Sequence, residues 1–198
     1  MARITLIEPG DGPPETEAAY DAVKALWGGQ LFTDWKPLGG SPDVLVALAT
    51  LFYRLQGERG GSITDIRDKE LVAIRTSALN RCDYCVGHNT HLGAAAGLTP
   101  TEIRAALGDE AACAEISSRH QALLRWTDLV TANTAAEDDA AYASLREHFE
   151  DAEIAELTLL SCMFNGWNRF TRSFHIELED VEGREGITAC PRPPAGRP

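Results

Sequence analysis

The sequence has few of the signals that predict β-strands. Alternating apolar residues occur only in residues 3–7, RITLI, and hairpins punctuated by glycine are missing. Helical periodicity recurs through the rest of the chain instead. The sequence therefore predicts an all-α protein.

The chain also lacks a long apolar run and an excess of positive charge. No apolar stretch approaches the roughly 20 residues that span a bilayer, and the apolar run at the N-terminus is too short for a signal peptide. Lys and Arg number 18 against 30 Asp and Glu, which gives a net charge of −12. Nucleic acids and anionic membrane surfaces would repel such a chain. We expect no nucleic-acid or membrane partner and a cytoplasmic location.

Capping residues identify several helix starts. Ser41 precedes Pro42, which is the arrangement of an N-cap followed by proline in the first helical position. Thr99 and Glu102 have the spacing of a capping box. A long and largely apolar segment, residues 152–179, is predicted to form a central helix.

Neither an internal repeat nor a linker divides the 198 residues. From about residue 182 the composition turns to Gly and Pro, which is typical of a tail and not of a packed element. The sequence predicts a single-domain helical bundle over residues 1–181 and a tail over residues 182–198.

Cysteine is scarce, and its number argues against a disulfide scaffold. The five cysteines are an odd number in a long chain, unlike the even, dense pattern of small secreted proteins. Cys113 and Cys162 stand in apolar stretches and are expected to be small buried side chains. Cys190 falls in the predicted tail. Only Cys82 and Cys85, three residues apart, have a spacing that needs an explanation.

A metal site is the first explanation to consider for the segment NRCDYCVGHNTHLG, residues 80–93. Cys82, Cys85, His88 and His91 are all zinc-ligand types. On a helix, however, residues three apart step about 60° around the axis, so these four side chains spread over half the circumference and cannot share one ion. Covalent haem is disfavoured because its motif has histidine directly after the second cysteine. We expect neither a metal nor a cofactor.

Thiol chemistry fits the same spacing. At a helix start, Cys82 and Cys85 can close a disulfide, and the free N–H groups and the helix dipole stabilise a thiolate. His88 lies one turn beyond Cys85 and can take or share its proton. A thiolate attacks a peroxide, and a neighbouring thiol converts the resulting sulfenic acid into a disulfide. The alternative is that both cysteines are merely buried at a helix start.

Glu70, twelve residues before Cys82, has mostly apolar neighbours in the sequence. By itself it is open to two interpretations. The carboxylate could be half-exposed or ion-paired, with Arg67 or Arg75 as the nearest partners, or it could act in catalysis.

The segment KELVAIRTSALNRCDYCVGHNTHLGAAAGLTPTEI resembles the core of the carboxymuconolactone decarboxylase superfamily, on its alkylhydroperoxidase D-like branch. That pattern has a glutamate, eleven intervening residues, Cys-x2-Cys and a histidine shortly after. Glu70, Cys82 and Cys85 match it. FNGWNRFTRSF is similar to a NAWNR helix of peroxidase-related members. The specific resemblance covers roughly residues 66–107 and 157–174.

The resemblance implies a cofactor-free thiol peroxidase with an alkylhydroperoxidase D-like helical bundle. Cys85 would be the peroxidatic thiolate, Cys82 the resolving thiol, and Glu70 with His88 the proton relay. The implied partners are a hydroperoxide substrate, a dithiol reductant and further copies of the chain, in a trimer or hexamer and less commonly a dimer.

One position departs from the family pattern. Asn89 stands where the family has its relay histidine, and asparagine cannot serve as a general base. Either His88 takes that role, or Glu70 acts through water, or peroxidase activity is weak. Tyr84, between the cysteines, is expected to pack, and His91 to lie on the far side of the helix.

Two other classes of function remain open. The first is a decarboxylase or another lyase that acts on a lactone, in which the cysteine pair would be dispensable. The second is a non-enzymatic, redox-responsive oligomeric protein in which the disulfide only changes the shape of the chain.

Overall fold

The structure is a computed structural model that describes residues 2–57 and 60–178. Within these ranges every regular element is a helix and no strand is present, so the predicted all-α fold is confirmed. No helix among them is both long and apolar enough to cross a membrane. The predicted tail, with Cys190, lies outside the described residues, and the single domain over residues 1–181 stays a prediction.

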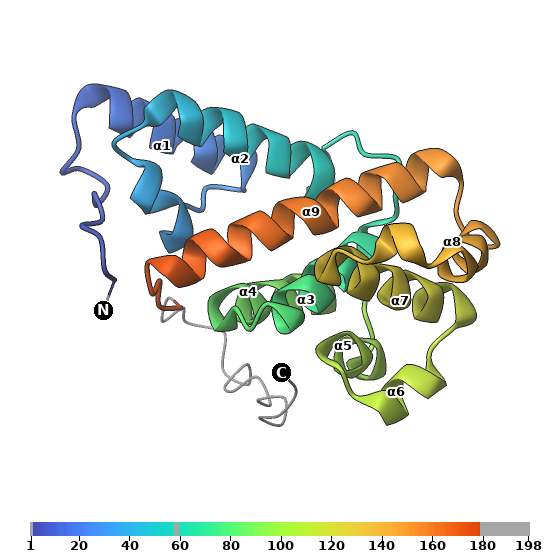
Figure 1. Cartoon of the computed structure of the whole chain (residues 1–198). Coiled ribbons are helices and arrows are strands. Elements are labelled where there is room, and N and C mark those ends of the chain that lie inside the picture. The colour runs from blue at the N-terminus through green and yellow to red at the C-terminus, as the bar shows by residue number, and fades with distance from the viewer. Residues whose placement is uncertain (1, 58–59, 179–198) are drawn as a thin grey trace. The chain divides into compact units, whose positions relative to one another are not determined.

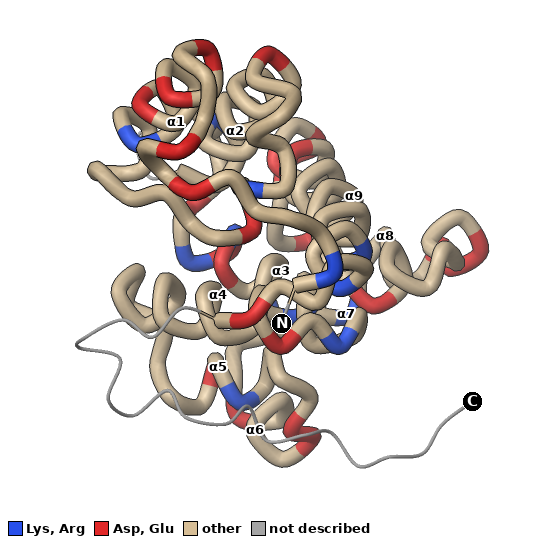
Figure 2. Tube along the Cα trace, turned by 90° about the vertical axis from the view of Figure 1, so that its left-hand side faces the viewer, with Lys and Arg blue, Asp and Glu red and all other residues tan. Residues whose placement is uncertain are grey.

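The chain divides into two compact units, each with its own helices (Figure 1). The first takes its described residues from Met1–Ser62 and Phe170–Asp180, and the second from Ile63–Arg169. Acidic residues recur in both, with Lys and Arg interspersed among them (Figure 2).

The first unit is built on two packed helices, α1 (Pro14–Leu26) and α2 (Pro42–Gln56), with the 3-10 helix η1 (Thr33–Leu38) between them. Its core contains Tyr20, Val23 and Leu45, all fully buried. Ser41 is the N-cap of α2 with Pro42 directly after it, as predicted, although the Ser41 side chain makes no capping hydrogen bond.

The second unit carries the cysteine segment, and α3 packs against α4, α5 and α7 within it. Its elements are α3 (Ile66–Leu79), α4 (Asp83–Ala95), α5 (Pro100–Leu107), α6 (Glu110–Glu115), α7 (Ser118–Ala132), η2 (Ala135–Glu137), α8 (Asp139–Arg146) and α9 (Asp151–Ser173). The helix α9 belongs to this unit as far as Arg169.

Capping explains where several of these helices begin. The Thr99–Glu102 capping box is present at the start of α5, as predicted. Residues 110–132 are divided into two helices, α6 and α7. The reason is Ser117, which has an extended backbone and accepts a hydrogen bond from the N–H of His120, so that it starts a new helix as its N-cap.

Three residues, Asn80, Arg81 and Cys82, join α3 to α4. Arg81 has a left-handed backbone with φ of 56°. The N–H of Cys82 donates to the carbonyl of Ser77, and that of Arg81 donates to the carbonyl of Ala78, both at 3.0 Å. This is a Schellman motif, which usually has glycine in the left-handed position. Cys82 therefore closes α3 and is also the N-cap of α4.

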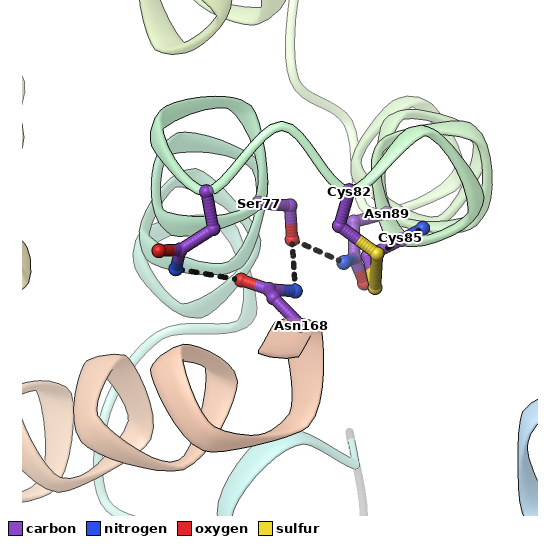
Figure 3. The surroundings of a disulfide bond; sticks show 6 residues. Ser77, Cys82, Cys85, Asn89 and Asn168 are labelled. Atoms are coloured by element: carbon purple, nitrogen blue, oxygen red, sulfur yellow. Dashed lines mark hydrogen bonds between the residues drawn. A yellow bond between two sulfur atoms is a disulfide. The ribbon is translucent and has the colours of Figure 1, made fainter. Parts of the chain in front are cut away.

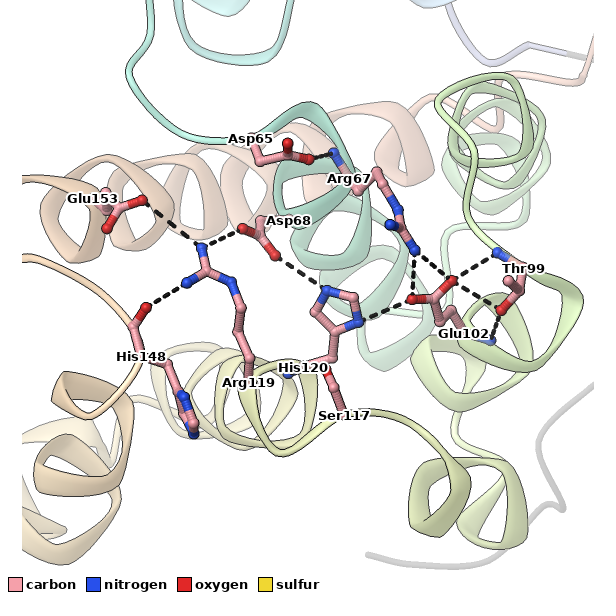
Figure 4. Close-up of polar contacts among 10 residues, drawn as sticks. All are labelled: Asp65, Arg67, Asp68, Thr99, Glu102, Ser117, Arg119, His120, His148 and Glu153. Atoms are coloured by element: carbon pink, nitrogen blue, oxygen red, sulfur yellow. Dashed lines mark hydrogen bonds and ion pairs between the residues drawn. The ribbon is translucent and has the colours of Figure 1, made fainter.

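A charged cluster fixes α3 to its neighbours in the second unit (Figure 4). The Asp68 carboxylate, whose side chain is 3% exposed, accepts a hydrogen bond from Arg119 at 2.7 Å and lies 3.4 Å from Nε2 of His120. His120 Nδ1 lies 3.0 Å from Glu102, which also binds Arg67 at 2.8 Å. The cluster thus connects α3 with α5 and α7 through charge-assisted contacts.

Burial alone would raise the pKa of Asp68, but the hydrogen bonds from His120 and Arg119 and their positive charges hold it below its usual value. A carboxyl group with a lowered pKa stabilises the fold above its unfolded pKa of about 3.9, and that stability is lost as the pH falls through the folded pKa.

We therefore expect Asp68→Asn to lower the free energy of unfolding at pH 7 by about 3 kcal/mol, since a buried ion pair loses one partner. The gap between wild type and variant should close as the pH falls below about 4. Urea unfolding between pH 3 and 8 measures this. Asp21→Asn, at an ion pair with Lys24 whose Asp21 side chain is 77% exposed, is the control and should have little effect. A gap that stays constant down to pH 3 would contradict the expectation.

Candidate active site around the cysteine pair

Cys82 and Cys85 are joined by a disulfide at the N-terminal end of α4 (Figure 3). Their Cα atoms are 5.3 Å apart. The N–H of Cys85 donates to Sγ of Cys82 at 3.4 Å. The predicted proximity of the two sulfur atoms at a helix start is confirmed. Both residues are buried, with exposed fractions of 1% for Cys82 and 3% for Cys85.

His88 lies on α4 one turn beyond Cys85 and is 9% exposed. Its ring contacts the ring of Tyr84, with centroids 4.5 Å apart, so Tyr84 packs as expected. His91, by contrast, is exposed. No three His, Cys, Asp or Glu side chains in the described part of the chain are grouped so that they could hold one metal ion.

Asn89 is buried on α4 and takes part in a polar network beside the disulfide (Figure 3). Its Nδ2 donates to the hydroxyl of Ser77 on α3 at 3.3 Å. The same hydroxyl accepts a second hydrogen bond, from Nδ2 of Asn168 on α9, at 3.2 Å. One serine oxygen therefore joins three helices at the cysteine pair.

Glu70 lies on α3 and is buried. Its Cβ would be 3.7 Å from a Cβ built on Gly93 of α4, so it faces α4 two turns beyond Cys85. The exposed fraction of 3% corrects the expectation of a half-exposed carboxylate. Each of the two arginines considered beside Glu70 binds a carboxylate on another helix. Arg67 binds Glu102, and Arg75 binds Asp128 at 2.5 Å. The role of Glu70 in catalysis stays a prediction.

Ser77 and Asn168 were missed as site residues in the sequence. Each lies in a segment that carries the family resemblance, but serine and asparagine are not residue types whose presence in a sequence indicates a site. The signal that could have identified Ser77 is helical spacing: Ser77 and Glu70 are seven residues apart, and so share one face of α3.

The prediction for the lone cysteines was wrong at Cys162. Cys162 is exposed and Cys113 is partly exposed. Apolar neighbours in sequence do not bury a residue on the outer face of an amphipathic helix, and Leu159, one turn earlier on α9, is also exposed.

The sequence and the all-α fold are similar to those of known proteins. The profile of the carboxymuconolactone decarboxylase family matches residues 42–129. Over these residues the chain is similar to the carboxymuconolactone decarboxylase superfamily, and its likeness to alkylhydroperoxidase D-like proteins supports that branch. The uncharacterized protein YdfG of Bacillus subtilis (strain 168) is 28% identical over 104 residues, which cover 52% of this chain and 70% of YdfG.

Solved structures with the same fold include several alkylhydroperoxidase D-like proteins. A protein of unknown function from Agrobacterium tumefaciens, called a putative antioxidant defence protein AhpD, has a TM-score of 0.62 and 28% identity, over 72% of this chain and 94% of its own. An uncharacterized peroxidase-related protein from Ralstonia eutropha JMP134 has a TM-score of 0.73 and 22% identity, over 90% and 93%. The debrominase Bmp8 has a TM-score of 0.69 and 18% identity, over 90% and 92%. The last two likenesses concern the fold alone.

A peptide map can test the disulfide in solution. Trypsin cleaves after Arg81 and Arg104, so that Cys82 and Cys85 fall in one peptide. In protein that has been oxidised, denatured and alkylated, this peptide should carry no label, and after reduction it should carry two. Cys113 and Cys162 should be labelled without reduction, because neither is in a disulfide. Two labels on the Cys82–Cys85 peptide before reduction would contradict the pairing.

Proposed function

We propose that this protein is a thiol-dependent hydroperoxidase that cycles between a Cys82–Cys85 dithiol and its disulfide. The observation that carries the proposal is the joined, buried cysteine pair at the N-terminal end of α4 with His88 one turn away. The Agrobacterium tumefaciens protein, which is 28% identical, is called a putative antioxidant defence protein, and this supports chemistry of this kind.

In the first step His88 takes the proton of Cys85, and the thiolate attacks the terminal oxygen of a hydroperoxide, ROOH. The O–O bond breaks, Cys85 becomes a sulfenic acid, and the leaving alkoxide receives the proton from His88 as ROH. Two electrons pass from sulfur to the peroxide. Buried Glu70 on the neighbouring helix is proposed to complete the relay, through water.

In the second step the thiolate of Cys82 attacks the sulfenic sulfur of Cys85. The S–S bond forms and the displaced hydroxide leaves as water after protonation. The hydrogen bond that the N–H of Cys85 donates to Sγ of Cys82 supports this role, because such a bond stabilises a thiolate on the attacking sulfur. An external dithiol then reduces the pair and is itself oxidised to a disulfide.

The partners proposed with this cycle are a hydroperoxide, a dithiol reductant and further copies of the chain in a homo-oligomer. Two other functions are outcomes of the tests. A lactone lyase would keep its activity without the cysteines, and a redox-responsive protein would form the disulfide with peroxide but would not turn over with a reductant.

The cysteine roles are tested by hydroperoxide consumption with and without a dithiol. Cys85→Ser should abolish consumption, because it removes the attacking sulfur. Cys82→Ser should consume about one equivalent and stop at a sulfenic acid that dimedone traps on Cys85, since no resolving thiol remains. Exposed Cys162→Ser is the control and should turn over like wild type. A dimedone adduct on Cys82 in the Cys85→Ser variant would reverse the roles.

The proton relay is tested with His88→Ala and Asn89→His under the same assay. If His88 is the general base, its loss should reduce kcat/KM by about 10²–10⁴-fold, and Asn89→His should change it little. A large gain with Asn89→His would instead mean that the natural chain lacks its base. Unchanged rates in both variants would leave Glu70 as the relay residue, and Glu70→Gln would then be the variant to measure.

A further inference from the structure

Ser77 has an unusual position among the buried polar groups of the second unit. Its side chain is fully buried, with an exposed fraction of 0%, and its hydroxyl oxygen accepts two amide N–H groups. One donor, Asn89, lies on the cysteine helix α4, and the other, Asn168, lies on α9 (Figure 3). The carbonyl of Ser77 also accepts the N–H of Cys82 at 3.0 Å. Ser77 thus binds α4 at its N-cap, Cys82, and again at Asn89, two turns later.

The same network holds the turn that leads into the cysteine pair. Oδ1 of Asn168, which is itself 0% exposed, accepts a hydrogen bond from Nδ2 of Asn80 at 3.1 Å. Asn80 is the C-cap of α3, and Nδ2 of Asn80 also donates to Oδ1 of Asn165 at 3.0 Å. The asparagines of α9 therefore hold the end of α3, while Ser77 holds the start of α4.

These contacts oppose the tendency of the junction to relax. A non-glycine residue in the left-handed region, here Arg81 with φ of 56°, costs roughly 1–2 kcal/mol relative to its relaxed conformation. Such a backbone persists only when its surroundings determine it. The bond of Asn168 to Asn80, before Arg81, and the bonds of Ser77 to Cys82 and Asn89, after it, hold the chain on both sides of Arg81.

We infer that Ser77 and Asn168 are positioning residues that keep the reduced Cys82 and Cys85 thiols within bonding distance. This inference rests on the proposed function, in which Cys82 must reach the sulfenic sulfur of Cys85 before a second peroxide does. With the network in place, closing the disulfide requires little further ordering of the chain. Without it, oxidation must first order the turn, so the disulfide becomes less stable and its formation slower.

Thr76 offers a matched control one residue away. Its hydroxyl is also 0% exposed and also hydrogen-bonds across to α9, at 3.2 Å from the hydroxyl of Ser161. Thr76→Val and Ser77→Ala therefore each remove one buried hydroxyl that bonds to α9. Of the two hydroxyls, only that of Ser77 also bonds to α4.

The first measurement is the equilibrium of the Cys82–Cys85 disulfide with dithiothreitol, read by peptide mapping of quenched samples. Ser77→Ala should lower the oxidation constant about 10-fold, since buried amides lose their acceptor, and this corresponds to a rise in potential of about 30 mV. Asn168→Ala, which changes the α9 side of the network, should also lower the oxidation constant. This variant replaces Ser77→Ala in the test if Ser77→Ala does not fold. The oxidation constant of Thr76→Val should stay within about twofold of wild type, even if its stability to urea is lower.

The second measurement is the fraction of Cys85 that is oxidised to sulfinic acid at increasing hydroperoxide. Ser77→Ala and Asn168→Ala should accumulate sulfinic acid at lower peroxide than wild type, because slower resolution leaves the sulfenic acid open to a second oxidation. Equal shifts in Ser77→Ala and Thr76→Val, or none in Ser77→Ala and Asn168→Ala, would overturn the inference. If wild type consumes no hydroperoxide, the proposed function fails, while the dithiothreitol equilibrium still decides whether Ser77 positions the pair.

Discussion

The close approach of α3 and α4 is the constraint on which the candidate site depends. At one end the Schellman junction leaves only Asn80 and Arg81 between the last residue of α3 and Cys82. At the other end a Cβ on Gly93 would lie 2.9 Å from the Cδ1 atoms of Ile74 and Leu98, so a larger residue there would require those two side chains to shift. Between these two points Ser77 of α3 and Asn89 of α4 are buried, and a hydrogen bond between them satisfies both side chains in part.

Because the polar side chains between these helices are buried, they depend on one another for hydrogen-bond partners. A buried donor or acceptor that loses its partner costs about 1–3 kcal/mol, so each member of the Ser77 network stabilises the arrangement of the others. The Asp68 cluster works in the same way with charges, at the contact of α3 with α5 and α7. The helix that carries Glu70 is thus held by polar contacts on more than one face, and α4 is placed against a rigid neighbour.

The parts of the fold that were predictable from sequence depend on local interactions. The capping box at Thr99 and the helix start at Ser41 and Pro42 each involve residues within one turn of each other, and their types alone identify them. The cysteine spacing likewise predicted a pair at a helix start. Residues 152–179 were predicted as one helix, but α9 ends at Ser173, before a left-handed residue at His175 with φ of 52°.

The rest of the site depends on contacts between residues far apart in the chain. Ser77 and Asn168 are separated by 91 positions, and nothing in either neighbourhood specifies the other. For the same reason the sequence did not show that Arg67 and Arg75 bind carboxylates on α5 and α7. Exposure of Cys162 was missed because an apolar segment does not reveal which of its faces the rest of the chain covers.

The length of the α3–α4 junction also sets the direction in which the cysteines point. Successive residues of an α-helix are related by a rotation of about 100°. One residue inserted after Arg81 would therefore rotate every side chain of α4 by that angle about the helix axis relative to α3. The sulfur atoms would then point in another direction, and Asn89 would no longer face Ser77. The loop has no slack to absorb such a change, because Cys82 is already bonded to the end of α3. The number of residues in this turn is thus as much a determinant of the site as the identity of its side chains.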